Sequence, residues 1–156
     1  MKTILGLSLG TRIAGLALCR DSYLIEWKVK SFKGHWTDGK LRDILHILKT
    51  VMSDYDVTCV VAKKPDIFRT SSALEELISE LRVLCNRQKI SFTMYSLKAM
   101  KYWYKESGVI TKSEMIKLAM EKYPEVYAAY NKEQRLKHGY YTKVFEAIIL
   151  TGKSIY

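Results

Sequence analysis

The chain has 156 residues, 48% of them hydrophobic and 27% charged, which is a globular composition and excludes a disordered chain. Its 26 Lys and Arg residues exceed its 16 Asp and Glu residues, giving a formal charge of +10. This excess attracts polyanions such as nucleic acid or an anionic membrane surface, although a solvated basic surface has the same sign. No apolar stretch approaches ~20 residues, so we expect no membrane span.

The first 19 residues superficially resemble a signal peptide that ends in a cysteine. Arg12 interrupts the apolar run, residues 10–12 have turn chemistry, and Leu18 is too large to precede a cleavage site. The cysteines Cys19, Cys59 and Cys85 are odd in number, far apart and set among apolar residues, which predicts buried thiols rather than disulfides or a zinc site. We therefore expect a cytoplasmic protein.

Three strands are expected to open the chain. Apolar runs at 3–9 and 13–19, separated by a turn, predict a hairpin, and residues 23–29 predict a third strand. Residues 31–40 contain two glycines and predict a loop. Asp38 is a candidate cap for the helix that follows.

Strands and helices are then expected to alternate. The patterns predict a helix with an apolar stripe from Leu41 to Met52, a strand at 57–62, a helix capped by Ser71 or Ser72, a strand at 90–95, and helices at about 97–105, 112–122 and 140–151. Pro124 marks a break, and the basic stretch 132–137 predicts a solvated loop or a helix end. This order predicts one α/β domain, residues 1–156, with a five-stranded mixed sheet covered by helices on both faces.

Four segments carry a resemblance to a known family. Residues 4–16, ILGLSLGTRIAGL, resemble the first hairpin of RuvC-type Holliday-junction resolvases, whose pattern is roughly ILGIDPGTRxTGxG. Residues 60–62 with 70–74 resemble the family's strand that ends in a metal-binding glutamate and its Ser-Ala-Leu helix start. Residues 95–112 keep two lysines of the family, and residues 141–151, YTKVFEAIILT, resemble its last helix, DxADALAIALT. The resemblance covers almost the whole chain and implies a ribonuclease-H-like fold, a branched DNA partner and a homodimer.

The family's metal-binding acids are missing from the matched positions. Without gaps, they fall on Ser8, Ala62, Tyr141 and Val144. Two Mg²⁺ ions need anionic oxygen ligands, and an ammonium such as that of Lys64, ~5 Å from a divalent ion at an effective dielectric of ~20, costs on the order of 7 kcal/mol. We therefore expect a cleft devoid of carboxylates, with no metal and no other cofactor, in a catalytically inactive relative of the resolvases.

Two further hypotheses remain open. An active metal-dependent, structure-specific endonuclease would use relocated acids, for which Asp21, Asp66 and Glu146 are the candidates. Glu146 is five residues from Tyr141 and two from Val144, which turns it off their face of the last helix. In that helix Tyr141, Val144, Phe145 and Ile148 also fit an ordinary core stripe. In the third hypothesis the fold is a scaffold for protein partners in a recombination or mobile-element complex.

The nucleic-acid contacts are predicted from basic and aromatic residues near these segments. Candidate phosphate contacts are Lys64, Arg69, Lys98, Lys101 and Lys112, and Phe68 is a candidate wedge because resolvases of this type carry an aromatic residue in that loop. Tyr102, Trp103 and Tyr104 are candidates for stacking on unpaired bases, although only one or two of three consecutive helical side chains can face solvent.

Overall fold

The structure is a computed structural model, and it describes residues 2–136 and 139–153. Its strands are β1 (Thr3–Ser8), β2 (Ile13–Arg20), β3 (Tyr23–Ser31), β4 (Cys59–Lys63) and β5 (Ser91–Tyr95). They form one sheet in the order β3-β2-β1-β4-β5. β1, β2 and β3 pair antiparallel, whereas β4 is parallel to β1 and β5 is parallel to β4. The predicted five-stranded mixed sheet is confirmed.

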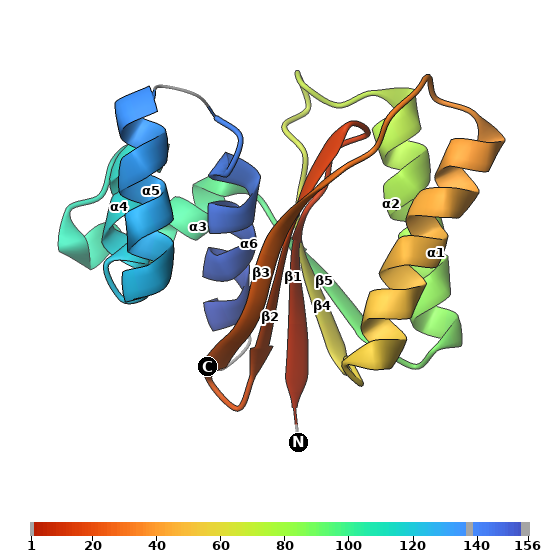
Figure 1. Ribbon diagram of the computed structural model, residues 1–156, viewed down its shortest axis with the longest axis horizontal. Helices are drawn as coiled ribbons and strands as arrows, with labels where there is room; N and C mark the ends of the chain where they lie inside the picture. The colour runs from red at the N-terminus through yellow and green to blue at the C-terminus, as the bar shows by residue number, and fades with distance from the viewer. Residues whose placement is uncertain (1, 137–138, 154–156) are drawn as a thin grey trace.

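Helices cover both faces of the sheet, as predicted (Figure 1). One face is covered by α1 (Asp38–Asp54) and α2 (Ser72–Arg87), and the other by α6 (Thr142–Lys153). Outside α6 lie α3 (Leu97–Tyr102), the short 3-10 helix η1 (Lys105–Ser107), α4 (Lys112–Met120) and α5 (Pro124–Leu136). Of the helices in the described part of the chain, none is long and apolar enough to span a membrane.

The helices confirm some of the sequence predictions and correct others. Residues 132–136 are the end of helix α5, which is one of the two alternatives predicted for this stretch, and α5 itself, which was not predicted, begins at Pro124. A proline is compatible with the first helical turn because its missing N–H has no partner there anyway. The cap of α1 is Thr37, whose hydroxyl accepts a hydrogen bond from the backbone N–H of Lys40, and not Asp38. Ser71 caps α2 as predicted.

The alternation of side chains along the strands divides the core into two layers. Leu5 and Leu7 of β1 pack with Ala62 of β4 in the layer beneath α1 and α2. Ile4 of β1 and Val61 of β4 point the other way, into the layer beneath α6. Residues of even number in β1 and of odd number in β4 therefore face α6, and this parity decides which side chains reach the functional site.

The carboxyl ends of four strands lie at the same end of the sheet. β1, β4 and β5 are mutually parallel, and β3 runs in their direction because it is antiparallel to β2. Their carboxyl ends lie at the top of Figure 1, where α6 begins. The connections that follow these strands, and the first turns of α6, therefore converge on one end of the molecule.

Candidate nucleic-acid interface

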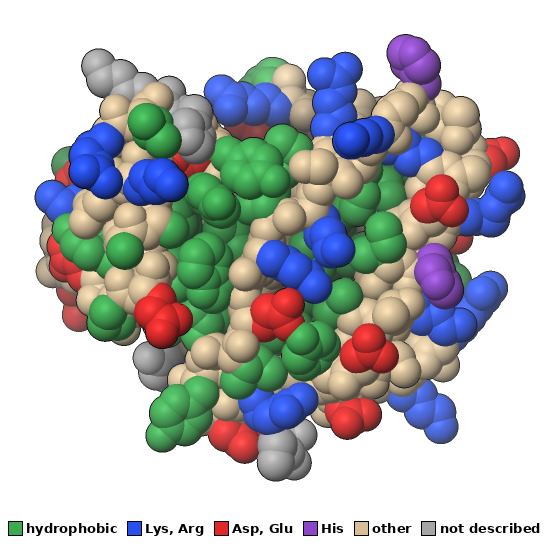
Figure 2. Space-filling model, in the orientation of Figure 1, with side chains coloured by type: hydrophobic (Ala, Val, Ile, Leu, Met, Phe, Trp, Pro, Cys, Tyr) green, Lys and Arg blue, Asp and Glu red, His purple; other side chains and the backbone are tan. Residues whose placement is uncertain are grey.

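A cleft of about 780 Å³ opens at this end of the sheet. It lies between the ends of β1 and β4, the first turns of α6 and the start of α4. Its lining includes six basic residues, Lys63, Lys64, Arg69, Lys98, Lys112 and Lys143, and two acidic residues, Asp66 and Glu146. The cleft therefore carries an excess of positive charge, and Figure 2 shows Lys and Arg side chains along the same upper rim of the molecule.

Glu146 lies at the centre of the cleft. Its side chain is 1% exposed, and its Oε1 accepts a hydrogen bond of 3.1 Å from the hydroxyl of Ser8. Its Oε2 lies 2.5 Å from the Nζ of Lys63 and 3.4 Å from the Nζ of Lys112. One buried carboxylate is thus held by a hydroxyl and two ammonium groups from three different elements.

Lys143 precedes Glu146 by one helical turn and also lines the cleft. It lies against Gly10: a Cβ atom at Gly10 would lie 3.3 Å from its Nζ and 2.7 Å from the backbone carbonyl oxygen of Ile13. Burial lowers the pKa of Lys143, the positive charges of Lys63 and Lys112 lower it further, and Glu146 opposes this shift. Lys143 thus retains its proton less readily than an exposed lysine does.

The matched metal-binding positions do not all reach the cleft. Ser8 does, but Ala62 is fully buried beneath α1 and α2, and Lys63 is the residue of β4 that faces Glu146. Val144 is fully buried, and Tyr141 packs against aromatic side chains of the core beneath α6. Val144, Phe145 and Ile148 form the core stripe that was the alternative interpretation of this helix.

The ungapped match to the resolvase family is therefore out of register with the structure in two places. On β4 the residue that faces the cleft is one position later than the ungapped match. On α6 the residues that face it are Lys143 and Glu146, whose spacing of three is that of the family's two aspartates. The expectation of a cleft devoid of carboxylates is wrong, because Glu146 occupies its centre.

The residues of the cleft do not fit a pair of divalent ions. Glu146 is neutralised by Lys63 and Lys112, and Asp66 accepts a hydrogen bond from the backbone N–H of Phe68 in its own exposed loop. Asp21 lies in the β2–β3 turn at the opposite edge of the sheet, where its N–H donates to the carbonyl of Lys2. Among the residues described, no three His, Cys, Asp or Glu side chains gather as metal ligands.

The predicted nucleic-acid residues are partly brought together. Lys64, Arg69, Lys98 and Lys112 line the cleft, with Lys112 paired to Glu146. Phe68 is 89% exposed in the β4–α2 loop beside the cleft. Lys101 is half-buried and lines an adjoining hollow of about 490 Å³ beside α3, which shares Ser96 and Lys98 with the cleft. Lys143 is a cleft residue that was not predicted from the sequence.

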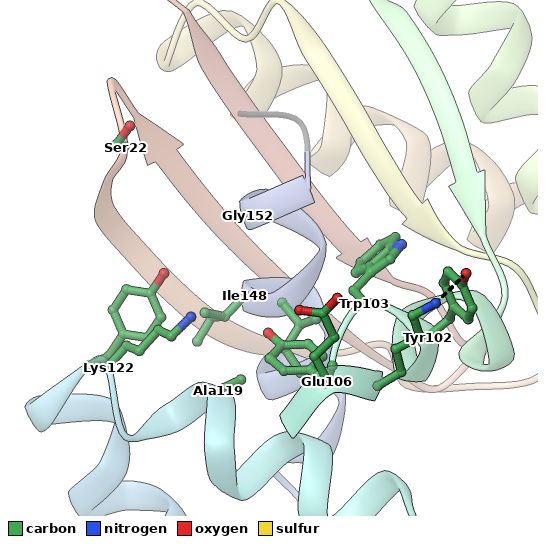
Figure 3. A pocket seen from close by; sticks show the side chains of 12 residues that line it. Ser22, Tyr102, Trp103, Glu106, Ala119, Lys122, Ile148 and Gly152 are labelled. Atoms are coloured by element: carbon green, nitrogen blue, oxygen red, sulfur yellow. Dashed lines mark hydrogen bonds between the residues drawn. The ribbon is translucent and has the colours of Figure 1, made fainter. Parts of the chain in front are cut away.

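The aromatic residues at the end of α3 belong mostly to another part of the molecule. Tyr102 is 63% exposed, and the Nζ of Lys105 lies 4.2 Å from its ring centroid. Trp103 is half-buried and packs edge-on against Tyr95. Figure 3 shows Tyr102 and Trp103 beside a second cavity, of about 850 Å³, that extends to Ser22 and Gly152. This cavity lies at the carboxyl end of α6, away from the cleft.

Comparison with known proteins supports the fold. The sequence matches no family profile and no curated protein. Among solved structures, it is similar to RuvC of Thermus thermophilus in complex with a Holliday junction substrate, with 11% identity over 96% of this chain and 90% of that chain and a TM-score of 0.67. The yeast mitochondrial Holliday junction resolvase is 13% identical over 94% of this chain and 75% of that chain, with a TM-score of 0.66.

A viral resolvase is similar over nearly its whole length. The fowlpox virus resolvase in complex with Holliday junction DNA is 11% identical, covering 98% of this chain and 96% of that chain, with a TM-score of 0.60. At such identities the similarity shows a shared fold. The chain therefore has the ribonuclease-H-like fold of these resolvases, as the resemblance implied.

Proposed function

We propose that the protein binds branched nucleic acid, such as a four-way DNA junction, in the cleft without cleaving it. The observation that carries the proposal is the ionic neutralisation of Glu146 by Lys63 and Lys112. Because this carboxylate is already paired, the cleft's remaining basic groups exceed its remaining acid, Asp66. Their charges are available to a polyanion.

The same charges argue against two-metal hydrolysis. A pair of divalent ions brings four positive charges and needs several anionic oxygens to hold them. Here Lys63 and Lys143 stand in the cleft, and a further lysine, Lys112, approaches Glu146. Ammonium groups in these places repel a divalent ion and attract a phosphate directly. We infer that lysines supply the positive charge of this site.

The similarity to resolvases solved with Holliday junctions supports a branched substrate over a linear one. Phe68 adds to this support, since an exposed aromatic side chain beside a basic cleft can stack on bases where strands separate. We further propose a homodimer, because a junction presents two symmetric strands to its binding protein.

The first experiment measures binding to a four-way junction, a linear duplex and a single strand at physiological salt, with a chelator present. We expect the junction to bind most tightly. The variant K64A/R69A/K98A should weaken binding about tenfold or more and reduce the slope of log affinity against log salt by about 2–3. The control K49A/R87A removes two exposed charges from α1 and the far end of α2, and should bind like the wild type.

Equal and negligible affinity for all three nucleic acids would overturn the proposal. A second assay incubates the junction with Mg²⁺ or Mn²⁺ and resolves the strands on a denaturing gel. We expect no cleavage by the wild type. Metal-dependent cleavage that is lost in E146Q or D66A would instead establish a nuclease with relocated acids.

A further inference from the structure

We propose that the β1–β2 turn and the β3–α1 loop form a second DNA-binding surface, which holds another duplex arm of the branched substrate. We call it the outer basic surface and define it by Arg12, Lys33 and His35. The inference rests on the proposed function, because it assigns an additional arm of the same substrate. No part of this surface lines the cleft.

In the strand order, the outer basic surface follows β3 and β1, and the predicted wedge, Phe68, follows the neighbouring strand β4. The segments after β3, β1, β4 and β5 emerge side by side at one end of the sheet; the first three carry Lys33, Arg12 and Phe68 in loops, and the fourth carries Lys98 in the first turn of α3. The loop of Phe68 thus lies between basic segments on both sides. Ile67 and Phe68 are 75% and 89% exposed. An apolar tip flanked by positive charge on each side suits a branch point, from which duplex arms diverge.

The strand ends that carry these residues form a line across the sheet. Adjacent strands lie ~4.8 Å apart, so the four steps from β3 to β5 span about 19 Å. Phosphates follow one another every ~3.4 Å along one DNA strand. From β3 to β4, whose loop carries Phe68, there are three of these steps, about 14 Å, which is long enough for about four phosphates on that side of the wedge.

The two loops are fixed in place by contacts with the body of the protein. Phe32 is buried in the core beneath α1 and α2, and its N–H donates to the carbonyl of Arg12 at 2.7 Å. Lys40 is only 8% exposed, and its Nζ donates to the carbonyl of Gly34 at 2.7 Å. Gly34 has a φ of 93°, which a residue with a Cβ rarely adopts. The loop therefore presents Lys33 and His35 from a defined backbone.

The charges of this surface are available to a ligand. Arg12, Lys33 and His35 are exposed. Within residues 2–136 and 139–153, the side chains of Arg12 and Lys33 form no hydrogen bond or ion pair. Asp43 is the one acid that lines the hollow of about 520 Å³ beside the β3–α1 loop, where Lys33 and Lys40 also lie. Lys63 and Lys112, by contrast, are paired with Glu146.

The test compares the charge-reversal variant R12E/K33E with the matched control K49E/R87E, which reverses two exposed charges remote from the strand ends. Binding is measured to a four-way junction and to a linear duplex as long as one arm. For R12E/K33E we expect junction affinity to fall about tenfold and the salt slope to fall by about 2. Duplex affinity should stay within about twofold of the wild type, since one arm is held by the cleft alone.

Three outcomes would overturn the outer basic surface. Junction affinity could match that of K49E/R87E, both substrates could weaken equally, or the duplex alone could weaken. Because Arg12 and Lys33 are exposed, thermal melts of R12E/K33E should match those of the control and exclude unfolding as the cause. If K64A/R69A/K98A weakens junction binding but R12E/K33E does not, only the outer surface fails. If neither variant weakens it, the proposed function fails as well.

Discussion

Two sides of helix α6 meet their surroundings in opposite ways. On one side of its first turns, Lys143 and Glu146 face the cleft, and Glu146 is held by Ser8, Lys63 and Lys112. On the side toward the sheet the backbone contact is close: the carbonyl oxygen of Lys143 lies 2.2 Å from the position that a Cβ would take at Gly15, and the carbonyl oxygen of Ala147 lies 2.1 Å from that position at Gly6. The helix is therefore anchored by tight packing along its length and carries ionisable groups at its first turns.

This difference shows how the fold tolerates a changed site. Packing against Gly6 and Gly15 fixes where the helix lies, so the side chains that face the cleft can change without moving it. Substitutions among these charged side chains change the electrostatic potential of the cleft more than they change the fold. We expect substitutions at the close backbone contacts to destabilise the protein and those among the cleft side chains to change binding.

The largest effect is expected from Gly6→Ala. The new Cβ would lie 2.1 Å from the carbonyl oxygen of Ala147 and 2.9 Å from Cγ2 of Thr151, so the helix must move away from β1. Overpacking of this kind costs about 3 kcal/mol, and more where backbone atoms clash. Urea denaturation should show a free energy of unfolding lowered by at least that amount.

The control for Gly6→Ala is a glycine of α6 itself. Gly152→Ala meets no atom within 4 Å, and alanine favours a helix by about 1 kcal/mol over glycine. It should leave the free energy of unfolding unchanged or raise it slightly. Equal loss of stability in both variants would show that α6 is not held by close approach at Gly6.

The packed core is also the part that the sequence predicts well. Apolar periodicity identified the stripes of α1, α2 and α6, and the thiols Cys19, Cys59 and Cys85 are all buried as predicted. Burial raises the pKa of Cys85 to about 11, which keeps it in the thiol form. Such patterns depend on local spacing, which a single sequence displays.

The cleft end was predicted less well, for a physical reason. Whether Ala62 or Lys63 faces the cleft depends on the register between β1 and β4, in which Leu7 is paired with Ala62. The sequence of neither strand determines this register. Glu146 carried one usable signal: it stands three residues after Lys143, the spacing of the family's two aspartates. An ungapped match conceals this spacing, because it aligns the two aspartates with Tyr141 and Val144, two residues before Lys143 and Glu146.

The next effect is expected from Glu146→Gln, at the cleft end. Glutamine keeps the shape of the side chain and an acceptor for Ser8 but removes the charge that pairs with Lys63 and Lys112. Both ammonium groups then become available to phosphate, and junction affinity should rise about threefold to tenfold. Titration of a labelled junction measures this. Lower affinity in E146Q would show that Glu146 itself organises the bound substrate.

The smallest effect is expected from Lys143→Met, which replaces a half-buried ammonium by an apolar side chain of similar length. Burial and the charges of Lys63 and Lys112 lower the pKa of Lys143 below 10.5. The folded protein therefore binds fewer protons than the unfolded chain between the lowered pKa and 10.5, and stability rises with pH in that window. Below the lowered pKa the unfavourable contribution of Lys143 is fully present.

Lys143→Met should therefore raise the free energy of unfolding at neutral pH by roughly 0.5–1 kcal/mol, as other stabilising substitutions do. The gain should shrink as pH approaches 10.5, because the lowered pKa leaves less of Lys143 charged there than of an exposed lysine. Urea denaturation at several pH values measures both, with the exposed Lys49→Met as control. The same variant should weaken junction binding about threefold through the lost charge. A gain in stability that is constant with pH would show that Lys143 is destabilising through its packing, and not through its charge.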